Sequence, residues 1–453
     1  MTTPLGARVV IAGTHSGVGK TTVATGLMAA FRARGTAVAS AKVGPDFIDP
    51  AYHSAATGRP PRNLDAWICG PEAMGPLAGR AAAGADLLIV EGVMGLFDGA
   101  GDGTPSSTAD LSVMLDAPVI LVVDARAMSQ SVAALVRGYR DHDPRVRLAG
   151  VILNFVGSPR HEALLRAALA TIDQPVLGVL GSDDALTWRS RHLGLVPVAE
   201  HPYTVAASLD RLARVIDASS DLAAIHRLAA SAPRRVVADP PLPKRSGRAR
   251  LAVAAGRAFS FSYQDNLEAL EAAGAELVPF DPLAETDLPE AVDGLVAGGG
   301  FPEVFATELA DNVALSSALR ARIGAGLVVW AECGGLLWLA RSLDGHQLVG
   351  AVDAAGAMGE RLTIGYRRAV VNADNPIAAA GFELRGHEFH YSTLEPQGQA
   401  CTFREGPVPR SEGFASPTML ASYLHLHLGG DPAPAARLVA TAGRAGSLFE
   451  PQA

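Results

Sequence analysis

The stretch that most constrains this chain is residues 8–22, which read RVVIAGTHSGVGKTT. An apolar, β-branched run ends at Gly13, a short glycine-rich loop follows, and Gly19, Lys20 and Thr21 open a helical pattern. A strand, a loop and a helix in this order form a phosphate site, because the loop N–H groups and the positive end of the helix dipole both face the anion. We therefore predict that the chain binds ATP or GTP.

The loop departs in one place from the usual pattern G-x-x-x-x-G-K-[ST]: Thr14 stands where the first glycine is expected, and Gly13 comes one place earlier. Lys20 can reach the β- and γ-phosphates, and the Thr21 hydroxyl can ligate Mg²⁺. A plain glycine-rich turn is the alternative, but the complete order of strand, Gly-Lys-Thr and helix favours phosphate binding. The residues predicted to bind the nucleotide are Gly13, Thr14, His15, Ser16, Gly17, Val18, Gly19, Lys20, Thr21, Thr22 and, on the next strand, Lys42.

Length and composition indicate a globular protein of two or three domains. The chain has 453 residues, 49% hydrophobic and 19% charged, and its formal net charge of −8 argues against nucleic acid as the main partner. Its three cysteines show no CxxC spacing and predict neither a disulfide framework nor a zinc site. The N-terminus lacks the pattern of a signal peptide, and the longest apolar stretch, 326–340, is too short to span a membrane. We expect a soluble, cytoplasmic protein with no membrane partner.

The first half alternates apolar, strand-like runs with helix-compatible segments. Near-continuous apolar strands alternating with helices predict a doubly wound parallel sheet that is covered on both faces. Ligands of such sheets lie at the carboxyl ends of the strands, so the residues just after each strand are the candidates for chemistry. The predicted strands are 37–43, 87–90, 119–123, 151–153 and 176–180, and the predicted helices include 22–34, 131–139 and 159–170.

Carboxylates gather at these strand ends. An acidic residue after a strand beside a phosphate loop is where a Mg²⁺ ligand or a water-positioning group belongs. Glu91 follows the third strand directly, and we favour such a role for it. For Asp46, Asp49, Asp65 and Asp98 a helix cap or a turn is an equally good interpretation, because glycines and prolines flank them. Lys42, at the end of a buried strand, is predicted to neutralise phosphate charge.

A basic, proline-rich segment interrupts the pattern at 232–249 and is predicted to be a linker. It separates a domain at 1–231 from a second domain at 250–453. The second domain resumes with predicted strands at 251–255, 277–280 and 295–297 and a predicted helix at 263–274.

The second domain carries a candidate nucleophile. The run 327–337, LVVWAECGGLL, joins an apolar strand to a helix through Cys333 and two glycines. A sharp turn from strand to helix exposes such a side chain, and the helix N-terminus favours the thiolate. The three glycines at 298–300, after another strand, can present N–H groups to an oxyanion. A buried structural cysteine and a tight turn are the alternatives; the combination favours a nucleophile.

A thiolate nucleophile needs a base, and two strand-like segments supply histidines. Segment 386–392 contains His387 and His390, and segment 422–428 contains His425 and His427. On one strand, His425 and His427 would point to the same face and could approach one site.

A nucleotide site joined to a Cys/His site suggests an enzyme that takes ammonia from glutamine and uses ATP to form an amide. Residues 42–50, 91–99, 332–335 and 387–392 together resemble the corrinoid a,c-diamide synthases of cobalamin biosynthesis, a family that includes enzymes acting on metal-free hydrogenobyrinic acid. The likeness covers nearly the whole chain in the right order.

The resemblance implies specific roles. The first domain is similar to dethiobiotin synthetase, which shares the shifted glycine of the loop, and the likeness implies Thr21, Asp65 and Glu91 as Mg²⁺ ligands. Lys42 would face the transferred phosphate, and Asp46, Asp49 and Asp98 would serve substrate binding or phosphoryl transfer. The second domain resembles class I glutamine amidotransferases. This likeness implies the nucleophile Cys333, the base His425, and an oxyanion hole at Gly299 and Gly300. Many class I enzymes carry a glutamate two places after the histidine, but His427 stands there, so the third member is left open.

The expected function is the ATP- and glutamine-dependent amidation of the a and c carboxylates of hydrogenobyrinic or cobyrinic acid, with Mg²⁺ as cofactor. The partners would be small molecules, the corrinoid acid, glutamine and ATP, together with a possible second copy of the chain. The alternatives are another tetrapyrrole amidase, such as cobyric acid synthase or a nickel-tetrapyrrole enzyme, and an ATPase switch with an inactive amidotransferase-like domain.

Overall fold

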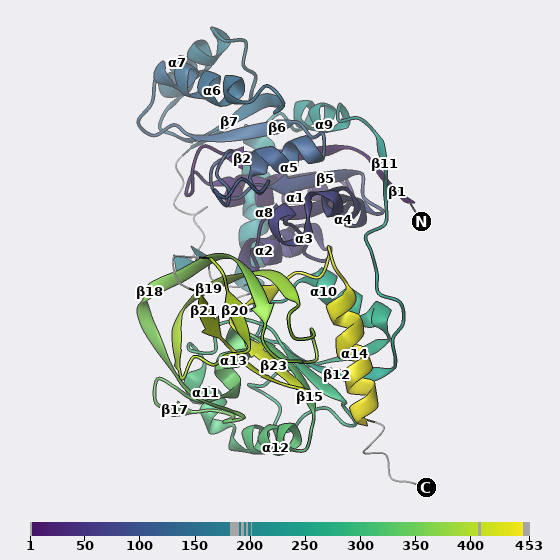
Figure 1. The fold of residues 1–453 in the computed structure, drawn as a ribbon. Helices are drawn as coiled ribbons and strands as arrows, with labels where there is room; N and C mark the ends of the chain where they lie inside the picture. Colours follow the sequence, from purple (N-terminus) through teal and green to yellow (C-terminus); the bar gives the residue numbers. More distant parts are fainter. Residues whose placement is uncertain are drawn as a thin grey trace. The chain divides into compact units, whose positions relative to one another are not determined.

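The computed structural model describes residues 2–181, 190–191, 194–195, 198–200, 202–405 and 409–446. The chain forms two compact units, Met1–Pro240 and Pro241–Ala453, coloured from purple to teal and from teal to yellow in Figure 1. The predicted linker is only partly a linker, because β11 (Arg235–Ala238) pairs antiparallel with β1 (Thr2–Leu5) inside the first unit.

The first unit is built on a parallel sheet with the strand order β4-β3-β5-β2-β6-β7-β8. Every residue of β2, β3 and β5 is buried, as expected for strands covered on both faces. The strands are β2 (Arg8–Gly13), β3 (Val38–Val43), β4 (Asn63–Leu64), β5 (Leu87–Glu91), β6 (Val119–Asp124), β7 (Leu148–Val156) and β8 (Val176–Gly181). The doubly wound parallel sheet predicted from the sequence is confirmed.

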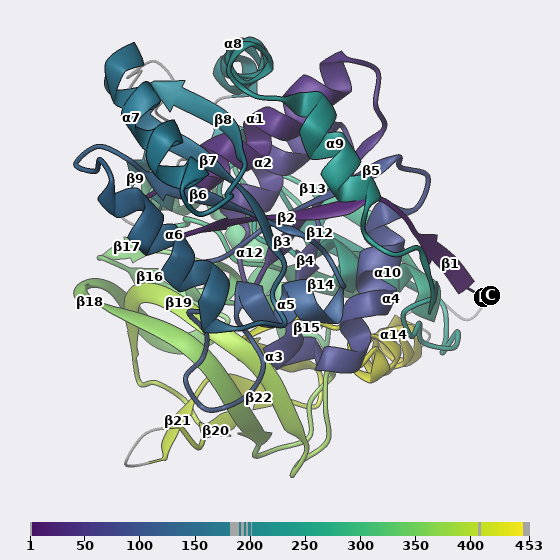
Figure 2. The same cartoon turned by 90° about the horizontal axis from the view of Figure 1, so that it is seen from above.

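Helices cover both faces of this sheet, with α1, α8 and α9 on one side of β2 and α5 and α6 on the other in Figure 2. Gly26 lets α1 approach α8, since a Cβ there would lie 2.6 Å from Ile216. The helices are α1 (Lys20–Ala33), α2 (Ile48–Thr57), α3 (Ala66–Cys69), α4 (Met74–Ala82), α5 (Thr108–Met114), α6 (Ser131–His142), α7 (Pro159–Ala170), α8 (Pro202–Ser219) and α9 (Leu222–Ala230). Two short strands, β9 (Ser190–Arg191) and β10 (Gly194–Leu195), pair with each other.

The second unit has a central sheet with the order β13-β12-β14-β15-β23-β22, parallel except for its edge strand β22. Its strands are β12 (Ala249–Ala254), β13 (Ala275–Phe280), β14 (Gly294–Ala297), β15 (Val328–Glu332), β22 (Phe414–Ser416) and β23 (Met419–Ser422). Its helices are α10 (Gln264–Ala273), α11 (Ala306–Asp311), α12 (Val313–Gly324), α13 (Gly334–Leu339) and α14 (Ala433–Gly446). The predicted helix at 263–274 corresponds to α10, which ends at Gly274 with a φ of 112°.

A second sheet in this unit has the order β17-β16-β18-β19-β24, with β20 beside β18 and β21 beside β20. Its strands are β16 (Ala340–Leu343), β17 (His346–Gln347), β18 (Val352–Val371), β19 (Glu383–Glu395), β20 (Cys401–Phe403), β21 (Arg410–Glu412) and β24 (His425–Leu426). The two long antiparallel strands β18 and β19 dominate it.

The continuous strand predicted for 422–428 is wrong. The chain leaves the central sheet after β23 and enters the second sheet at β24, where His425 lies opposite His387 on β19. Side chains rather than strands accept the N–H groups in between: Tyr423 N donates to Glu412, and Leu424 N donates to the Ser422 hydroxyl. The predicted site around Cys333 and His425 therefore takes residues from both sheets.

Candidate active sites

The phosphate loop in the first unit has the conformation that its glycines suggest. Gly17 and Gly19 have φ angles of 84° and 89°, which side chains with a Cβ rarely adopt. A Cβ at Gly19 would lie 2.2 Å from the Asn154 side-chain nitrogen, and one at Gly13 would lie 2.8 Å from the Lys20 side chain. Asn154, at the end of β7, donates to the Val18 carbonyl (2.9 Å) and fixes the loop. Sequence reasoning does not single out Asn154.

Lys20 is held in this loop without a carboxylate among its hydrogen-bond acceptors. Its ammonium donates to the His15 carbonyl (3.1 Å), and the loop is also held by Tyr139, whose hydroxyl donates to the Thr14 carbonyl. Burial and the nearby Lys42 lower the pKa of Lys20 to about 8. A bound anion would relieve both effects, so this site favours a phosphate.

A cluster of charged side chains lies beside the loop at the carboxyl ends of β3 and β5. Lys42 donates to Asp49 (2.7 Å), to Glu91 (2.8 Å) and to the Gly92 carbonyl (3.0 Å). The Thr21 hydroxyl donates to Glu91 (2.7 Å) and to Asp49 (3.2 Å). Burial alone would raise the pKa of Glu91, but Lys42 and the hydrogen bond from His53 outweigh it and hold that pKa well below its usual range. The same carboxylates hold the pKa of Lys42 above its usual range.

His53 belongs to this cluster and was not anticipated from the sequence. Its Nε2 lies 2.5 Å from the second oxygen of Glu91, and both side chains are fully buried. His53 follows Asp49 by four positions on α2, so the two share one face of the helix. That spacing is the signal that could have revealed it.

The remaining predicted carboxylates have local partners. Asp46 accepts hydrogen bonds from the N–H groups of Ile48 and Asp49, and burial followed by the charge of Asp49 raises its pKa to about 7. Asp65 caps α3 by accepting from Ile68 N (2.9 Å), and Asp98 accepts from Gly95 N (2.8 Å). These contacts match the alternative interpretation of the sequence, in which the carboxylates cap helices or stabilise turns. The roles predicted for Asp46, Asp65 and Asp98 in binding metal or substrate stay predictions.

The oxygen atoms of Thr21, Asp49 and Glu91 converge in a way that fits Mg²⁺. The Thr21 hydroxyl lies within hydrogen-bond distance of both carboxylates. The Lys42 ammonium, which contacts the same two carboxylates, provides the positive charge here. Within the described ranges no group of three or more His, Cys, Asp and Glu side chains is arranged to hold a metal ion alone. Mg²⁺ usually binds through one or two carboxylates together with substrate phosphates, so such a group is not required.

In the second unit, Cys333 lies at a sharp turn between β15 and α13. It is a non-glycine residue with a φ of 48° and a ψ of −98°, an unusual backbone conformation that the surroundings hold in place. Its N–H donates to the Ser422 carbonyl (2.8 Å). The glycines that follow are required by space, since a Cβ at Gly335 would lie 2.2 Å from the Ala297 carbonyl oxygen and one at Gly334 would lie 2.9 Å from Gly300 N. This geometry matches the predicted nucleophile turn.

His425 is the histidine that the structure brings to Cys333. A Cβ at Gly299 would lie 2.6 Å from the His425 ring, so the ring packs on the glycine loop. Burial lowers the pKa of His425, but the charge of Cys333 and hydrogen bonds to Cys333 and Glu332 outweigh it and raise the pKa to about 10. This raised pKa favours the imidazolium form of His425 beside Cys333.

The predicted oxyanion hole is only partly supported. The Gly299 N–H donates to the Phe261 carbonyl (3.0 Å) within a short antiparallel bridge, so this N–H is directed away from an oxyanion. Gly300 N lies next to Gly334, close to the turn that carries Cys333. Of the two predicted donors, Gly300 is the one with suitable placement.

The other histidines have partners elsewhere. His387 Nε2 lies 2.9 Å from the Tyr263 hydroxyl, and His390 Nδ1 lies 2.8 Å from the Ser392 carbonyl oxygen. His427 lies 3.7 Å from Asp265 and packs on the Tyr263 ring, so these two residues are among its partners. Glu332, which sequence reasoning did not assign to the site, lies 3.4 Å from His425 Nδ1.

Comparison with known proteins identifies a domain family for each unit. Residues 9–196 match the model of the CobQ/CobB/MinD/ParA nucleotide binding domain, and residues 250–433 match that of the CobB/CobQ-like glutamine amidotransferase domain. Hydrogenobyrinate a,c-diamide synthase of Streptomyces coelicolor is 49% identical, and the alignment covers 95% of this chain and 96% of the relative. The enzyme of the same name from Thermobifida fusca is 46% identical, with 96% of each chain covered. The chain belongs to the a,c-diamide synthase family.

Another member of the family, cobyrinate a,c-diamide synthase of a Synechococcus strain, is 41% identical over 94% of this chain and 96% of the relative. The family resemblance drawn from residues 42–50, 91–99, 332–335 and 387–392 is thus confirmed. As in its relatives, the chain combines a nucleotide-binding domain with a glutamine amidotransferase domain, the organisation of a glutamine-dependent amidating ligase.

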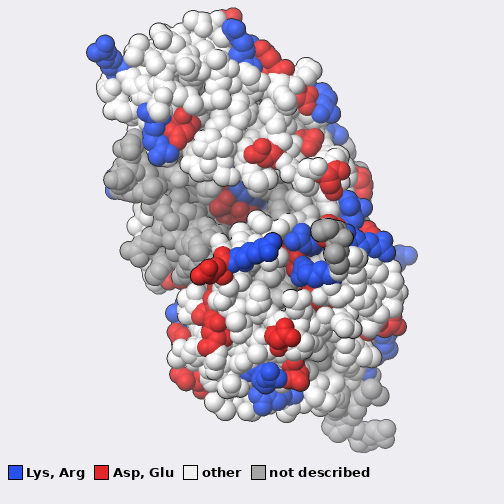
Figure 3. Space-filling view, turned by 60° about the vertical axis from the view of Figure 1, so that its left-hand side comes forward, with Lys and Arg blue, Asp and Glu red and all other residues white. Residues whose placement is uncertain are grey.

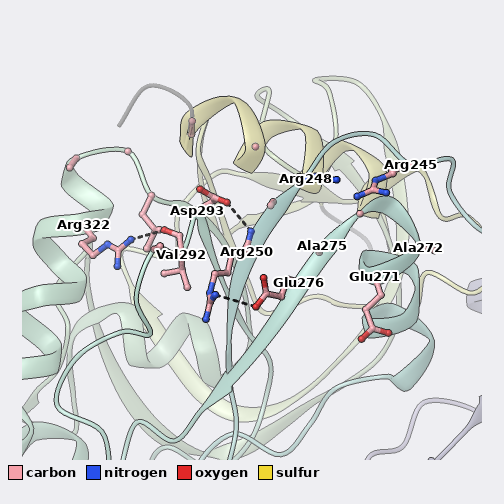
Figure 4. Close-up of a pocket in the computed structure, with 18 residues that line it drawn as sticks. Arg245, Arg248, Arg250, Glu271, Ala272, Ala275, Glu276, Val292, Asp293 and Arg322 are labelled. Carbon is pink, nitrogen blue, oxygen red and sulfur yellow. Dashed lines mark hydrogen bonds and ion pairs between the residues drawn. The ribbon is translucent and has the colours of Figure 1, made fainter. Parts of the chain in front are cut away.

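The second unit contains a cavity of about 1170 Å³, lined among others by Arg245, Arg250 and Arg322 (Figure 4). It opens at the amino ends of β12, β13 and β15, whereas Cys333 follows the carboxyl end of β15. Arg250 on its wall pairs with Glu276 (3.2 Å) and donates through its main chain to Asp293. The size of this cavity is therefore no guide to the chemistry.

A smaller cavity of about 530 Å³ lies beside β18 and β19 and is lined by Arg361, Arg367 and Arg410 among others. Arg367 and Arg410 both donate to Glu388 (2.6 and 2.5 Å), which is fully buried. Burial would raise the pKa of Glu388, but the nearby His390, at 3.6 Å, and the hydrogen bond from Arg410 lower it to about 2. Basic side chains also form a row on the face of the second unit in Figure 3.

Among the described residues, no helix has the length and apolarity needed to cross a membrane.

Proposed function

We propose that the chain amidates the a and c side-chain carboxylates of hydrogenobyrinic or cobyrinic acid with ATP and glutamine, in cobalamin biosynthesis. The observation that carries the proposal is the presence in one chain of a phosphate loop beside Lys42 and Glu91 and of a Cys333–His425 pair at a nucleophile turn. Relatives named for hydrogenobyrinate are 43–49% identical, against 41–42% for relatives named for cobyrinate, which supports the metal-free substrate.

The second unit would release ammonia from glutamine. The Cys333 thiolate attacks the side-chain amide carbon, and the N–H groups of Gly300 and Gly334 stabilise the oxyanion that forms. The His425 imidazolium donates its proton to the departing nitrogen, so that ammonia leaves and a thioester remains. Water, deprotonated by His425, then hydrolyses the thioester to glutamate and restores the thiol.

The first unit would activate the carboxylate. Its loop holds the phosphates of ATP, and Lys20 and Lys42 neutralise charge on the γ-phosphoryl group as it moves to a corrinoid carboxylate oxygen. Ammonia then attacks the acyl phosphate, and phosphate leaves as the amide forms. Mg²⁺ bound with ATP would neutralise further charge, held by Thr21, Asp49 and Glu91 with Asp65 as a further predicted ligand. Asp46 and Asp98 are proposed to contact the substrate side of this reaction.

The mass of the product tests the proposal. The protein is incubated with ATP, Mg²⁺ and glutamine and with either hydrogenobyrinic acid or cobyrinic acid. Two successive losses of about one mass unit are expected, because each amidation replaces a hydroxyl by an amino group. Cys333→Ala should lose the reaction with glutamine and keep it with ammonium chloride. ATP hydrolysis without any mass change on either acid would refute the proposal and favour the ATPase switch or another acid as substrate.

A further inference from the structure

Glu332 directly precedes the nucleophile in the chain, yet its carboxylate lies against the histidine. Its Oε2 is 3.4 Å from His425 Nδ1, and its Oε1 accepts the Leu426 N–H at 3.0 Å. The Glu332 side chain is only 8% exposed and that of His425 only 2%. One carboxylate thus holds both the ring of His425 and the main chain that follows it.

No other described carboxylate takes this place. Asp265 faces His427, Glu388 holds Arg367 and Arg410, and Glu412 accepts from Ser422 and Tyr423. Among the described residues, Cys333 and Glu332 contact His425, and the ring of His387 stacks on that of His425 with 4.9 Å between centroids. His427 follows two places along the chain. Glu332 is the one acid among these groups that touches the imidazole.

The contact decides which ring nitrogen of His425 faces the nucleophile. With Nδ1 directed to the Glu332 carboxylate, Nε2 is left for the Cys333 sulfur. A carboxylate on Nδ1 also stabilises the imidazolium that forms when the thiol gives up its proton. Cys333 and Glu332 are consecutive residues at a sharp turn, where Cys333 has a φ of 48° and a ψ of −98°, and both side chains contact the same imidazole.

We propose that Glu332 is a positioning residue for glutamine hydrolysis, acting through His425 as the third member of the Cys333–His425 site. This inference rests on the proposed glutaminase activity. It replaces the acid that would be expected two places after the histidine, where this chain has His427.

Glu332→Gln in the full-length chain tests the role. The amide keeps an oxygen that can accept the Leu426 N–H, but it lacks the negative charge. We expect kcat for glutamine hydrolysis to fall about 10- to 100-fold, with KM changed by less than about threefold. Amidation supported by ammonium chloride should stay at the wild-type rate, because the first unit is untouched.

Alkylation of Cys333 by iodoacetamide gives a second readout, because only the thiolate reacts. Without the carboxylate the imidazolium is less stable, so the pH of half-maximal alkylation should rise. Asp293→Asn is the control: Asp293 is half-buried and also accepts a main-chain N–H, from Arg250 at 2.8 Å, but it lies at the amino ends of the central strands. The control should leave kcat and the alkylation profile unchanged.

A Glu332→Gln protein with wild-type kcat and a wild-type alkylation profile would overturn the inference, leaving Glu332 as a structural acceptor of the Leu426 N–H. If Glu332→Gln loses ammonia-supported amidation as well, it has misfolded, and Glu332→Asp decides instead. That variant keeps the charge but withdraws it by one methylene, and unchanged kcat and alkylation would again overturn the inference. Glutamine hydrolysis that survives Cys333→Ala would instead refute the proposed glutaminase, whatever Glu332 does.

Discussion

Removing the charge of Lys42 tests the cluster beside the phosphate loop. Lys42 is 3% exposed, and its ammonium is the shared partner of Asp49 and the fully buried Glu91. Lys42→Met keeps most of the volume and leaves two carboxylates without their cation. Removing one partner of a buried ion pair costs about 3–5 kcal/mol. For a unit of this size each kcal/mol lowers Tm by about 2–4 °C, so we expect a loss of about 6–20 °C.

The effect should depend on pH in a defined direction. Lys42 holds the pKa of Glu91 below its ordinary value of 4.5, so the stabilisation from this pair is complete above about pH 4.5 and is lost as the pH falls further. In Lys42→Met, Glu91 can take up a proton at higher pH because burial is no longer opposed by Lys42. The difference in Tm between variant and wild type should therefore be largest near pH 7.5 and shrink towards about pH 4.5.

Lys20→Met is the matched control. Lys20 is also buried, but burial and Lys42 lower its pKa to about 8 from an ordinary 10.5, so its charge is unfavourable in the fold. Its removal should therefore not lower Tm at neutral pH. Thermal unfolding of the nucleotide-free proteins followed by circular dichroism compares them. Equal losses for the two variants, or a Lys42→Met deficit that does not vary with pH, would refute the reasoning.

Three further substitutions separate the two chemistries. Gly335→Ala places a Cβ against the Ala297 carbonyl, so the rate of glutamine hydrolysis should fall at least about 100-fold while ammonia-supported amidation survives. Amidation kinetics measured with glutamine and with ammonium chloride would contradict this if the variant kept wild-type rates with both donors. Gly19→Ala puts a side chain at a position with a φ of 89° and a clash with Asn154, so ATP affinity should fall at least about tenfold. Titration calorimetry measures this, and an unchanged affinity would contradict the prediction. His53→Ala removes the 2.5 Å partner of Glu91 and should lower the free energy of unfolding, measured in urea, by about 2–4 kcal/mol. The same variant should slow amidation but not glutamine hydrolysis. An unchanged urea unfolding midpoint would argue against this role of His53.

The first unit could be predicted well because its central strands are mostly apolar. β2, β3 and β5 are buried at every position, and polar residues interrupt their apolar runs at only a few places, such as Arg8, Ser40 and Lys42. Helix α7 has the predicted bounds, since Ser158 caps it and a proline follows at the first position. The phosphate loop and the turn at Cys333 could also be found, because both are local patterns of a strand, small residues and a helix.

The second sheet of the second unit was largely missed for a physical reason. β18 is half-exposed along most of its 20 residues and carries several charged side chains, so it shows no apolar run. The break between β23 and β24 depends on Glu412, which is distant in sequence from the segment it caps. His53 and Glu332 were missed because their roles follow from contacts made only in the folded chain, with Glu91 and with His425.

The glutaminase pair draws its two members from different sheets, since Cys333 ends a strand of the central sheet and His425 pairs with β19 of the second. A shift of about 1 Å between the sheets is enough to spoil such a pair. One apolar cluster, which includes Trp330, Leu384 and Leu424, packs against both sheets and sets their alignment. Glutamine hydrolysis therefore depends on the packing of this core as much as on two side chains. A relative whose core packing loosened would lose glutamine hydrolysis and still use free ammonia, with every catalytic residue in place.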